Sequence, residues 1–289
     1  MRERGRHRPR PRHLPRELPP HIPDHMPIHT PRHTPSDITR YIRYESAGAV
    51  HFARLEGDTI HRLDGDFLTG GTADGTTRPL ADVRVLAPVR PGKIIAVGLN
   101  YTSHLGTRNA PTEPGLFAMY PSAVVGPDDD IVPPPDAGPV HFEGELVLVV
   151  GRRAARIAAE DALDHLFGVT AGNDISERGW QRSDLQWIRA KSSDTFAPIG
   201  PAVVTGLPID DLLLRTRLNG EVVQEERTAD LLFGVPEILE YITRHVTLEP
   251  GDLVFTGTPG TTRGMHPGDV VEVEIEGIGV LRNTVRAAE

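Results

Sequence analysis

The stretch His141-Phe142-Glu143-Gly144-Glu145 runs directly into five apolar residues, Leu146-Val147-Leu148-Val149-Val150. Such an apolar run is typical of a strand buried on both faces of a sheet. On a strand, Glu143 and Glu145 occupy positions i and i+2, so their side chains point to the same side. Two carboxylates held ~5–7 Å apart repel each other, and a hard divalent cation is the best reason to keep them there. The alternative is an exposed strand end, where a Glu-x-Glu pair is ordinary.

A third carboxylate, Asp174, lies in the segment 168–176, between a strand-like run and a possible helix start. One interpretation makes Asp174 the N-cap of that helix, because Asp is preferred at this position. The other makes it the third oxygen ligand of the same cation. The spacing of the residues leaves both interpretations open.

Further motifs surround these carboxylates. They are Val97-Gly98-Leu99-Asn100-Tyr101-x-x-His104, Glu143-x-Glu145, Asn173-Asp174-Ile175-Ser176-x-Arg178-x-x-Gln181, Lys191-Ser192-x-Asp194-Thr195-Phe196-x-Pro198-Ile199-Gly200-Pro201, Asn219-Gly220-Glu221-Val222-Val223-Gln224, Thr256-Gly257-Thr258-Pro259 and Gly268-Asp269-Val270-Val271. Together they resemble the fumarylacetoacetate hydrolase superfamily, from about residue 93 to residue 286.

The resemblance implies a β-dominated α+β fold, in which a mixed β-roll-like catalytic domain follows a small β-rich N-terminal unit. It places the metal ligands at Glu143, Glu145 and Asp174 and implies one Mg²⁺ or Mn²⁺ ion, both of which suit carboxylate oxygens. The substrate would be a small 2-oxo acid, whose enolate the cation stabilises as a Lewis acid. The resemblance also implies a homodimer.

Lys191 is one of only two lysines in a chain that otherwise uses arginine, the other being Lys93. The resemblance places the Lys191 ammonium beside the oxyanion of the substrate. A lysine kept in such a composition suggests a role that arginine does not fill. The alternative is a surface lysine, or a partner for Asp194.

Four more side chains complete the predicted site. Arg178 and Gln181 would face a substrate carboxylate or a second carbonyl, since Arg binds carboxylates in a bidentate manner. They follow Asp174 by four and seven residues, so a helix would keep all three on one side, although an exposed amphipathic helix has the same spacing. Thr258 matches the family's contact to the distal carboxylate. His104 is the candidate general base, because its ordinary pKa lies near neutral pH.

The chain departs from the family on the side of the site that handles water and substrate. Hydrolytic members pair the histidine with a Glu three residues later, where this chain has Thr107. A lysine common in the family is replaced by Met119. Glu113 or Glu177 are the possible substitutes for the missing carboxylate.

Two enzymatic functions therefore compete. The first is a metal-dependent hydrolase that cleaves a C–C bond in an acylpyruvate-type or fumarylacetoacetate-type diketo acid. The alternative is an isomerase, tautomerase or decarboxylase of a hydroxymuconate-type or oxaloacetate-type acid at the same site, and the loss of the Glu at position 107 favours it. A catalytically inactive binding protein is a third possibility, but such a protein has no reason to keep Lys191, Arg178 and His104 together.

The composition of the chain bears on its partners and its location. The chain has 289 residues, no cysteine and a net charge of −9, of which residues 1–37 contribute +4 and the rest −13. An acidic body argues against nucleic acid as a partner. The absence of cysteine fits a reducing compartment, no run of ~18 apolar residues suggests a membrane span, and no apolar segment follows the basic N-terminus as in a signal peptide. We therefore expect a cytoplasmic protein.

Three segments are predicted along the chain. Residues 1–37, rich in Pro, His and Arg, read as a disordered tail, with a His tract as a possible metal site or a start codon upstream of the true one as alternatives. Residues 38–86 read as a small β-rich unit, and residues 87–289 as the catalytic domain. Helices are expected at 158–166 and 236–245, with short strands over most of the remainder.

Overall fold

The computed structural model describes residues 38–288, so the predictions for the tail at residues 1–37 lie outside the described residues. Strands hold 43% of the residues and helices 18%, which confirms the β-dominated α+β class. Within the described part of the chain, no helix is long and apolar enough to cross a membrane.

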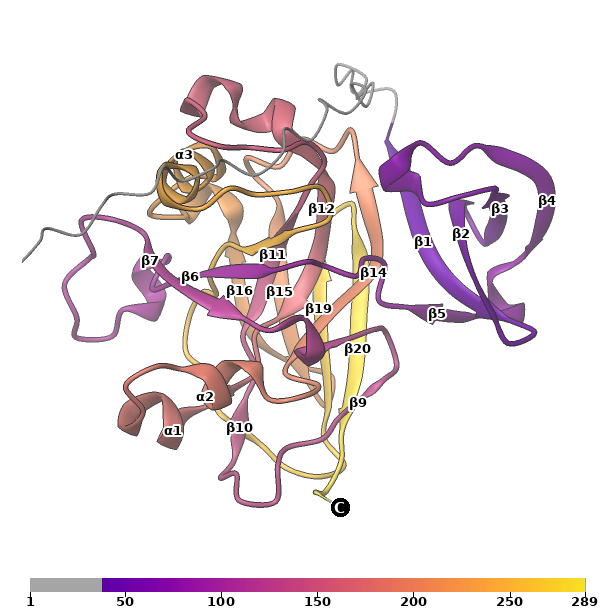
Figure 1. The fold of residues 1–289 in the computed structure, drawn as a ribbon. Coiled ribbons are helices and arrows are strands. Elements are labelled where there is room, and N and C mark those ends of the chain that lie inside the picture. The colour runs from indigo at the N-terminus through magenta and orange to yellow at the C-terminus, as the bar shows by residue number, and fades with distance from the viewer. Residues whose placement is uncertain (1–37, 289) are drawn as a thin grey trace, which may run out of the picture.

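A twelve-stranded sheet runs through the whole molecule (Figure 1). Its main path is β4-β3-β2-β1-β14-β12-β11-β17-β6-β7, with β5 paired to β1 and β8 paired to β14. The strands are β1 (Thr39–Ser46), β2 (Ala49–Glu56), β3 (Thr59–Leu63), β4 (Ala73–Pro79), β5 (Arg84–Leu86), β6 (Ile94–Gly98), β7 (Gly115–Met119), β8 (Val124–Val125), β11 (Gly144–Val150), β12 (Leu166–Asn173), β14 (Ala197–Thr205) and β17 (Leu253–Phe255).

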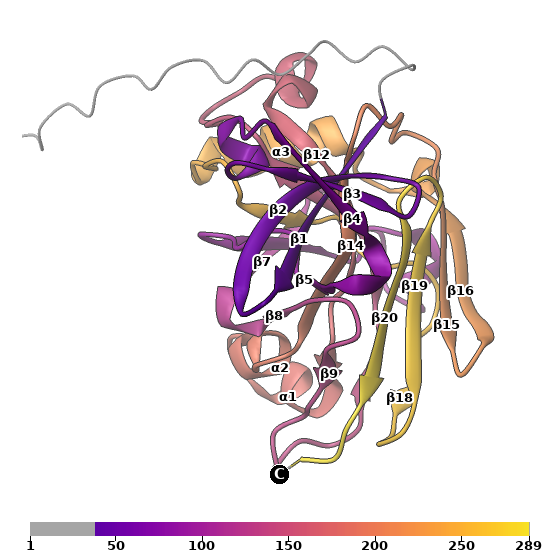
Figure 2. The ribbon, with the colours of Figure 1, turned by 90° about the vertical axis from the view of Figure 1, so that its right-hand side faces the viewer.

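The first four strands form an antiparallel meander, seen from its outer side in Figure 2. Ile42, Tyr44, Ala53 and Ile60 form a separate small core with Ala202 of β14. Strand β1 also pairs with β14, where Tyr41 lies opposite Val203. The N-terminal strands therefore extend the central sheet instead of standing apart from it.

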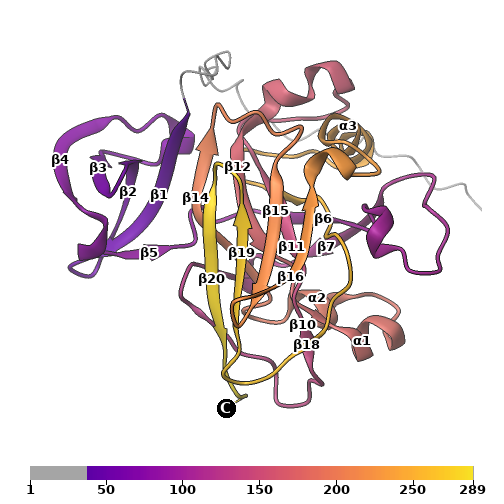
Figure 3. The same cartoon turned by 180° about the vertical axis from the view of Figure 1, so that it is seen from behind.

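A five-stranded sheet with the order β16-β15-β19-β20-β9 packs against the central sheet (Figure 3). Its strands are β9 (Asp130–Ile131), β15 (Leu213–Leu218), β16 (Glu221–Arg227), β19 (Val270–Ile275) and β20 (Gly279–Val285). Alternate residues of β19, Val271, Val273 and Ile275, are buried, as their period of two predicts. A third sheet joins β10 (Val140–His141), β13 (Ser176–Glu177) and β18 (Gly264–Met265).

Helices are short and lie at the edges of the sheets. The α-helices are α1 (Arg178–Ser183), α2 (Ile188–Ser192) and α3 (Val235–His245), and the 3₁₀ turns are η1 (Phe67–Thr69), η2 (Leu80–Asp82), η3 (Thr102–His104), η4 (Pro121–Ala123), η5 (Ala159–His165) and η6 (Thr228–Asp230). The predicted helix at 236–245 is confirmed, with Pro236 in its first turn. The predicted helix at 158–166 is instead the 3₁₀ helix η5.

Strand β11 is buried at every position, as its apolar run predicts. It begins at Gly144, so Glu143 stands one residue before the strand and Glu145 lies within it. A side chain at Gly144 would meet the Thr216 hydroxyl at 2.2 Å, since β15 packs against the other face. Only glycine fits between the two glutamates, and it lets both carboxylates project from the opposite face.

Candidate active site

The candidate site is built where β11 begins and β12 ends. Gly144 of β11 pairs with Asn173 of β12, so the residues just beyond this pair, Glu143 and Asp174, are neighbours. The Asp174 amide donates to the Glu143 carbonyl at 2.9 Å, and the Glu143 amide donates to Asn173 Oδ1 at 2.8 Å. These two hydrogen bonds hold the backbone of both acids in place.

Glu143, Glu145 and Asp174 form one buried cluster, with 4%, 2% and 1% of their surface exposed. One carboxylate oxygen of each lies within 4.8 Å of the others. The Gly257 amide donates to Glu145 Oε2 at 2.7 Å, which fixes that carboxylate. Asp174 Oδ1 is buried and has no hydrogen-bond partner among residues 38–288.

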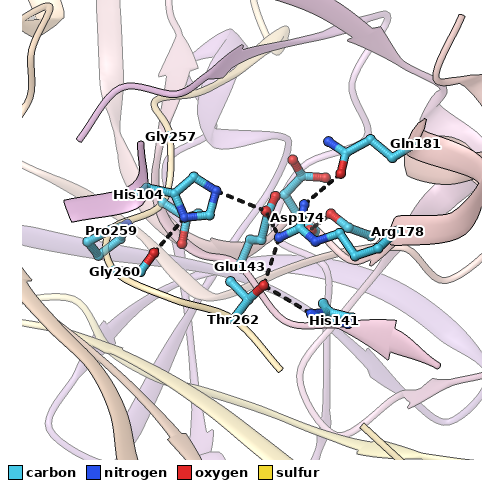
Figure 4. Close-up of polar contacts among 12 residues, drawn as sticks. His104, His141, Glu143, Asp174, Arg178, Gln181, Gly257, Pro259, Gly260 and Thr262 are labelled. Carbon is cyan, nitrogen blue, oxygen red and sulfur yellow. Dashed lines mark hydrogen bonds and ion pairs between the residues drawn. The ribbon is translucent and has the colours of Figure 1, made fainter. Parts of the chain in front are cut away.

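Two cations lie against this acid cluster. Lys191 Nζ is 2.5 Å from Glu143 Oε2 and 2.5 Å from Asp174 Oδ2, and only 2% of its side chain is exposed. Arg178 donates to Glu143 Oε1, to Gln181 Oε1 at 2.7 Å and to the Thr262 hydroxyl at 2.8 Å (Figure 4). The alternative interpretation of Lys191, as a surface lysine or a partner for Asp194, is therefore wrong, because the buried ammonium lies among the carboxylates of the cluster.

Burial and mutual repulsion disturb the ionisation of the cluster. Burial raises the pKa of Glu145 well above its usual value, and the neighbouring Asp174 and Glu143 raise it further. Burial likewise raises the pKa of Asp174 to about 7, although Lys191 opposes this. Burial would also raise the pKa of Glu143, but Lys191 and Arg178 hold it well below its usual range. Burial would lower the pKa of Lys191, yet Asp174 and Glu143 raise it above its ordinary value.

These residues fit a hard divalent cation. The donor set is three carboxylates, which suits Mg²⁺ or Mn²⁺, and Asp174 Oδ1 is a buried acceptor that nothing in the described part of the chain satisfies. A cation would also relieve the repulsion that raises the pKa values of Glu145 and Asp174.

We expect Mn²⁺ at about 100 times its Kd to stabilise the protein by about 2.7 kcal/mol, and Asp174→Asn to abolish that gain. Because Asp174 must lose its proton before it can act as a ligand, the affinity should fall as the pH drops below about 7. Chemical denaturation with Mn²⁺ or with EDTA measures both effects. Asp161→Asn on the exposed surface of η5 is the control, and an equal Mn²⁺ gain in both variants would exclude Asp174 as a ligand.

His104 closes the 3₁₀ turn η3 and faces the acid cluster. Its Nδ1 lies 2.6 Å from the Gly260 carbonyl oxygen, which can only accept, so Nδ1 carries the proton. Nε2 points toward Glu143 Oε1, 3.6 Å away (Figure 4). A backbone carbonyl thus orients this ring, where the sequence led us to look for a carboxylate.

The sequence-based substitutes for that carboxylate are both wrong. Glu177 caps helix α1 by accepting from the Trp180 amide, and Glu113 accepts from the Tyr241 hydroxyl at 3.3 Å. The N-cap interpretation of Asp174 is wrong for the same reason, since Glu177 holds that position. Asp174 does not share a helix with Arg178 and Gln181, because α1 begins only at Arg178.

All eight predicted site residues line one cavity of about 190 Å³. They are His104, Glu143, Glu145, Asp174, Arg178, Gln181, Lys191 and Thr258. The Thr258 hydroxyl already donates to the Gly144 carbonyl at 2.9 Å, so its proton is committed to the protein. Met119 is buried in the core and does not line the cavity.

Seven other lining residues were not predicted as site residues, although Val97, Gly98 and Leu99 lie within the first quoted motif. They are Val97, Gly98, Leu99, Arg108, Phe117, Arg182 and Trp187. Phe117 and Trp187 meet edge to face, with ring centroids 5.2 Å apart. The tripeptide Gln186-Trp187-Ile188 carries no periodic or motif signal, so only the folded chain brings this ring to Phe117.

Comparison with known proteins agrees with this geometry. A sequence model of the family "Fumarylacetoacetate (FAA) hydrolase C-terminal" matches residues 93–286, and one of "Rv2993c-like, N-terminal" matches residues 39–88. Protein Rv2993c of Mycobacterium tuberculosis is 42% identical over 255 residues, which span 84% of this chain and 96% of that protein.

Two similar proteins carry the name of an activity. The mitochondrial oxaloacetate tautomerase FAHD2A of Bos taurus is 42% identical over 222 residues, 72% of this chain and 71% of that protein. A crystal structure described as 2-hydroxyhepta-2,4-diene-1,7-dioate isomerase from Mycobacterium marinum is 42% identical, with a TM-score of 0.81 over 86% of this chain and 98% of that chain.

Proposed function

The chain belongs to the fumarylacetoacetate hydrolase family of enzymes, and we propose that it is a tautomerase or isomerase of a small 2-oxo acid of the oxaloacetate type. Of the two functions predicted from the sequence, we therefore favour the isomerase over the hydrolase. The names of the bovine and mycobacterial relatives support that order.

The observation that carries the proposal is the environment of His104. Its Nδ1–H donates to the Gly260 carbonyl, so Nε2 is the nitrogen that faces the site and can exchange a proton there. Glu143, beside Nε2, is the nearest carboxylate, and we assign it to the metal. Because a backbone carbonyl and not a carboxylate orients the ring, we favour proton transfer on a bound enol over the deprotonation of water.

The reaction needs only one proton to change place. His104 Nε2 would take the proton from the enol hydroxyl and deliver it to the adjacent carbon, so that an O–H bond is broken and a C–H bond is formed. Glu143, Glu145 and Asp174 would hold Mg²⁺ or Mn²⁺, which supplies Lewis-acid stabilisation of the enolate charge. Lys191 would add a second positive charge beside the enolate oxygen. Arg178 and Gln181 would bind the substrate carboxylate.

We expect the protein to convert enol-oxaloacetate to the keto form faster than the uncatalysed reaction, and EDTA to remove this acceleration. The ultraviolet absorbance of the enol follows the rate, and NMR in D₂O identifies the product, which should be oxaloacetate labelled at C3. Pyruvate and carbon dioxide would instead indicate a decarboxylase. Hydrolysis of an acylpyruvate without any conversion of oxaloacetate would instead show that the enzyme is a hydrolase.

The remaining assignments stay proposals. We propose that the enzyme is a homodimer, which sedimentation velocity tests directly. We also keep the division into a tail at 1–37, a small unit at 38–86 and a catalytic domain at 87–289. The cytoplasmic location stays a prediction, and one relative is named as mitochondrial.

A further inference from the structure

Two arginines outside the predicted site line the mouth of the same cavity. Arg108 lies in the loop between η3 and β7, and Arg182 lies in α1. Both side chains are exposed. Figures 1 and 3 show that this loop and α1 lie on one side of the molecule. We call Arg108 and Arg182 the rim arginines.

Neither rim arginine is neutralised by the protein. Within residues 38–288, no carboxylate lies at ion-pair distance from Arg108 or Arg182. Their neighbours behave differently, since Arg178 pairs with Glu143, and Arg189 pairs with Asp184 at 2.7 Å. Two cations at the mouth of one cavity are therefore free to take an anionic partner.

The charges of the cavity are arranged in two layers. The three metal-site carboxylates lie at its buried end, together with Lys191 and Arg178. The rim arginines are the exposed lining residues and mark its open end, and the rings of Phe117 and Trp187 form an aromatic part of its wall. A molecule whose 2-oxo acid end reaches the buried end would present its other end to the rim arginines.

We infer that Arg108 and Arg182 bind the distal carboxylate of a dianionic 2-oxo acid and thereby select dicarboxylates over monocarboxylates. The guanidinium group suits this task, because its donors match the two oxygens of a carboxylate. The aromatic wall favours a flat enol between the two charged ends. The inference rests on the proposed function, because it assigns a specificity to that same site.

The test compares oxaloacetate with its 4-methyl ester, which keeps the enol and lacks the distal charge. In Arg108→Gln and Arg182→Gln, the KM for oxaloacetate should rise about five- to tenfold at physiological ionic strength, as the loss of one exposed charged hydrogen bond predicts. The kcat for oxaloacetate and both constants for the ester should stay unchanged. Arg244→Gln, an exposed arginine on α3 that is paired with Glu240, is the matched control.

A conservative variant separates binding from long-range attraction. Arg182→Lys keeps the charge and loses the two-pronged donor, so binding predicts a raised KM for oxaloacetate, whereas mere attraction of anions predicts no change. An equal loss with oxaloacetate and with the ester would overturn the inference, and so would a wild-type KM in both Gln variants.

A binding experiment distinguishes failure of this inference from failure of the proposed tautomerase function. Calorimetry with Mn²⁺ present compares 2-oxoglutarate with 2-oxohexanoate, a monoanion of similar length. A preference for 2-oxoglutarate that disappears in the Gln variants supports the inference even if no tautomerisation is seen. Tautomerisation in a protein that binds both acids equally well overturns the inference and leaves the function standing.

Discussion

Lys191→Met is expected to lower the free energy of unfolding by about 3–5 kcal/mol in the presence of EDTA. The substitution removes the ammonium that contacts Glu143 and Asp174 and leaves three buried carboxylates with too little positive charge. A divalent cation can replace that charge, so Mn²⁺ should restore most of the lost stability. It should not restore turnover, because the second positive charge at the substrate oxygen is gone. Urea denaturation with EDTA or with Mn²⁺ measures the stability, and the tautomerase assay measures turnover.

Lys93→Met is the matched control, since Lys93 is the other lysine of the chain and pairs with the buried Asp252. The free energy of unfolding of this variant should also fall. Mn²⁺ should not restore the part lost with the Lys93–Asp252 pair, because Asp252 is not part of the acid cluster. If Mn²⁺ restores both variants equally, or if Lys191→Met is as stable as wild type in EDTA, the assigned role of Lys191 is wrong.

His104→Gln is expected to lower kcat for enol-oxaloacetate by about 10²–10⁴-fold, the range found when a general acid–base group is removed. Glutamine reaches a similar distance but cannot accept and return a proton. The Mn²⁺ affinity and the KM should change little, because His104 makes no hydrogen bond to the carboxylates and lies 3.6 Å from Glu143 Oε1. Stopped-flow absorbance measures kcat, and calorimetry measures Mn²⁺ binding.

His245→Gln, at the exposed end of α3, controls for the loss of a histidine away from the site. A second variant, His104→Ala, leaves room for free imidazole, which should restore part of the rate if the ring acts as a proton carrier. Loss of Mn²⁺ binding together with activity in His104→Gln would instead indicate that the residue supports the metal site.

Much of the fold follows from local pattern. The apolar run at 146–150 predicted a fully buried strand, and β11 is buried throughout. The alternation at 271–275 and the stripe at 238–242 predicted β19 and α3. These predictions hold because burial on one face of a strand or helix repeats with the geometry of that element alone.

For the candidate site, the sequence predicted the residues but not the contacts that position them. The chain order of its motifs pointed to eight residues, and all of them line one cavity. The explanation for Arg178 and Gln181, a helix shared with Asp174, was wrong, because the chain leaves β12 and forms β13 before α1 begins. The carboxylate proposed to orient His104 was wrong as well, since that partner is the carbonyl of Gly260, 156 residues away in the sequence.

The sequence by itself therefore determined the strands and the family motifs, and it predicted which side chains would bind the cation and carry the proton. Only the tertiary structure decided how they meet. The pairing of Gly144 with Asn173 brings Glu143 beside Asp174, and the approach of a distant turn sets the tautomer of His104. The cavity also gathers Arg108 and Arg182 at one mouth. Spacing along a chain describes neighbours within one element, whereas contacts between elements depend on register and packing that no local pattern encodes.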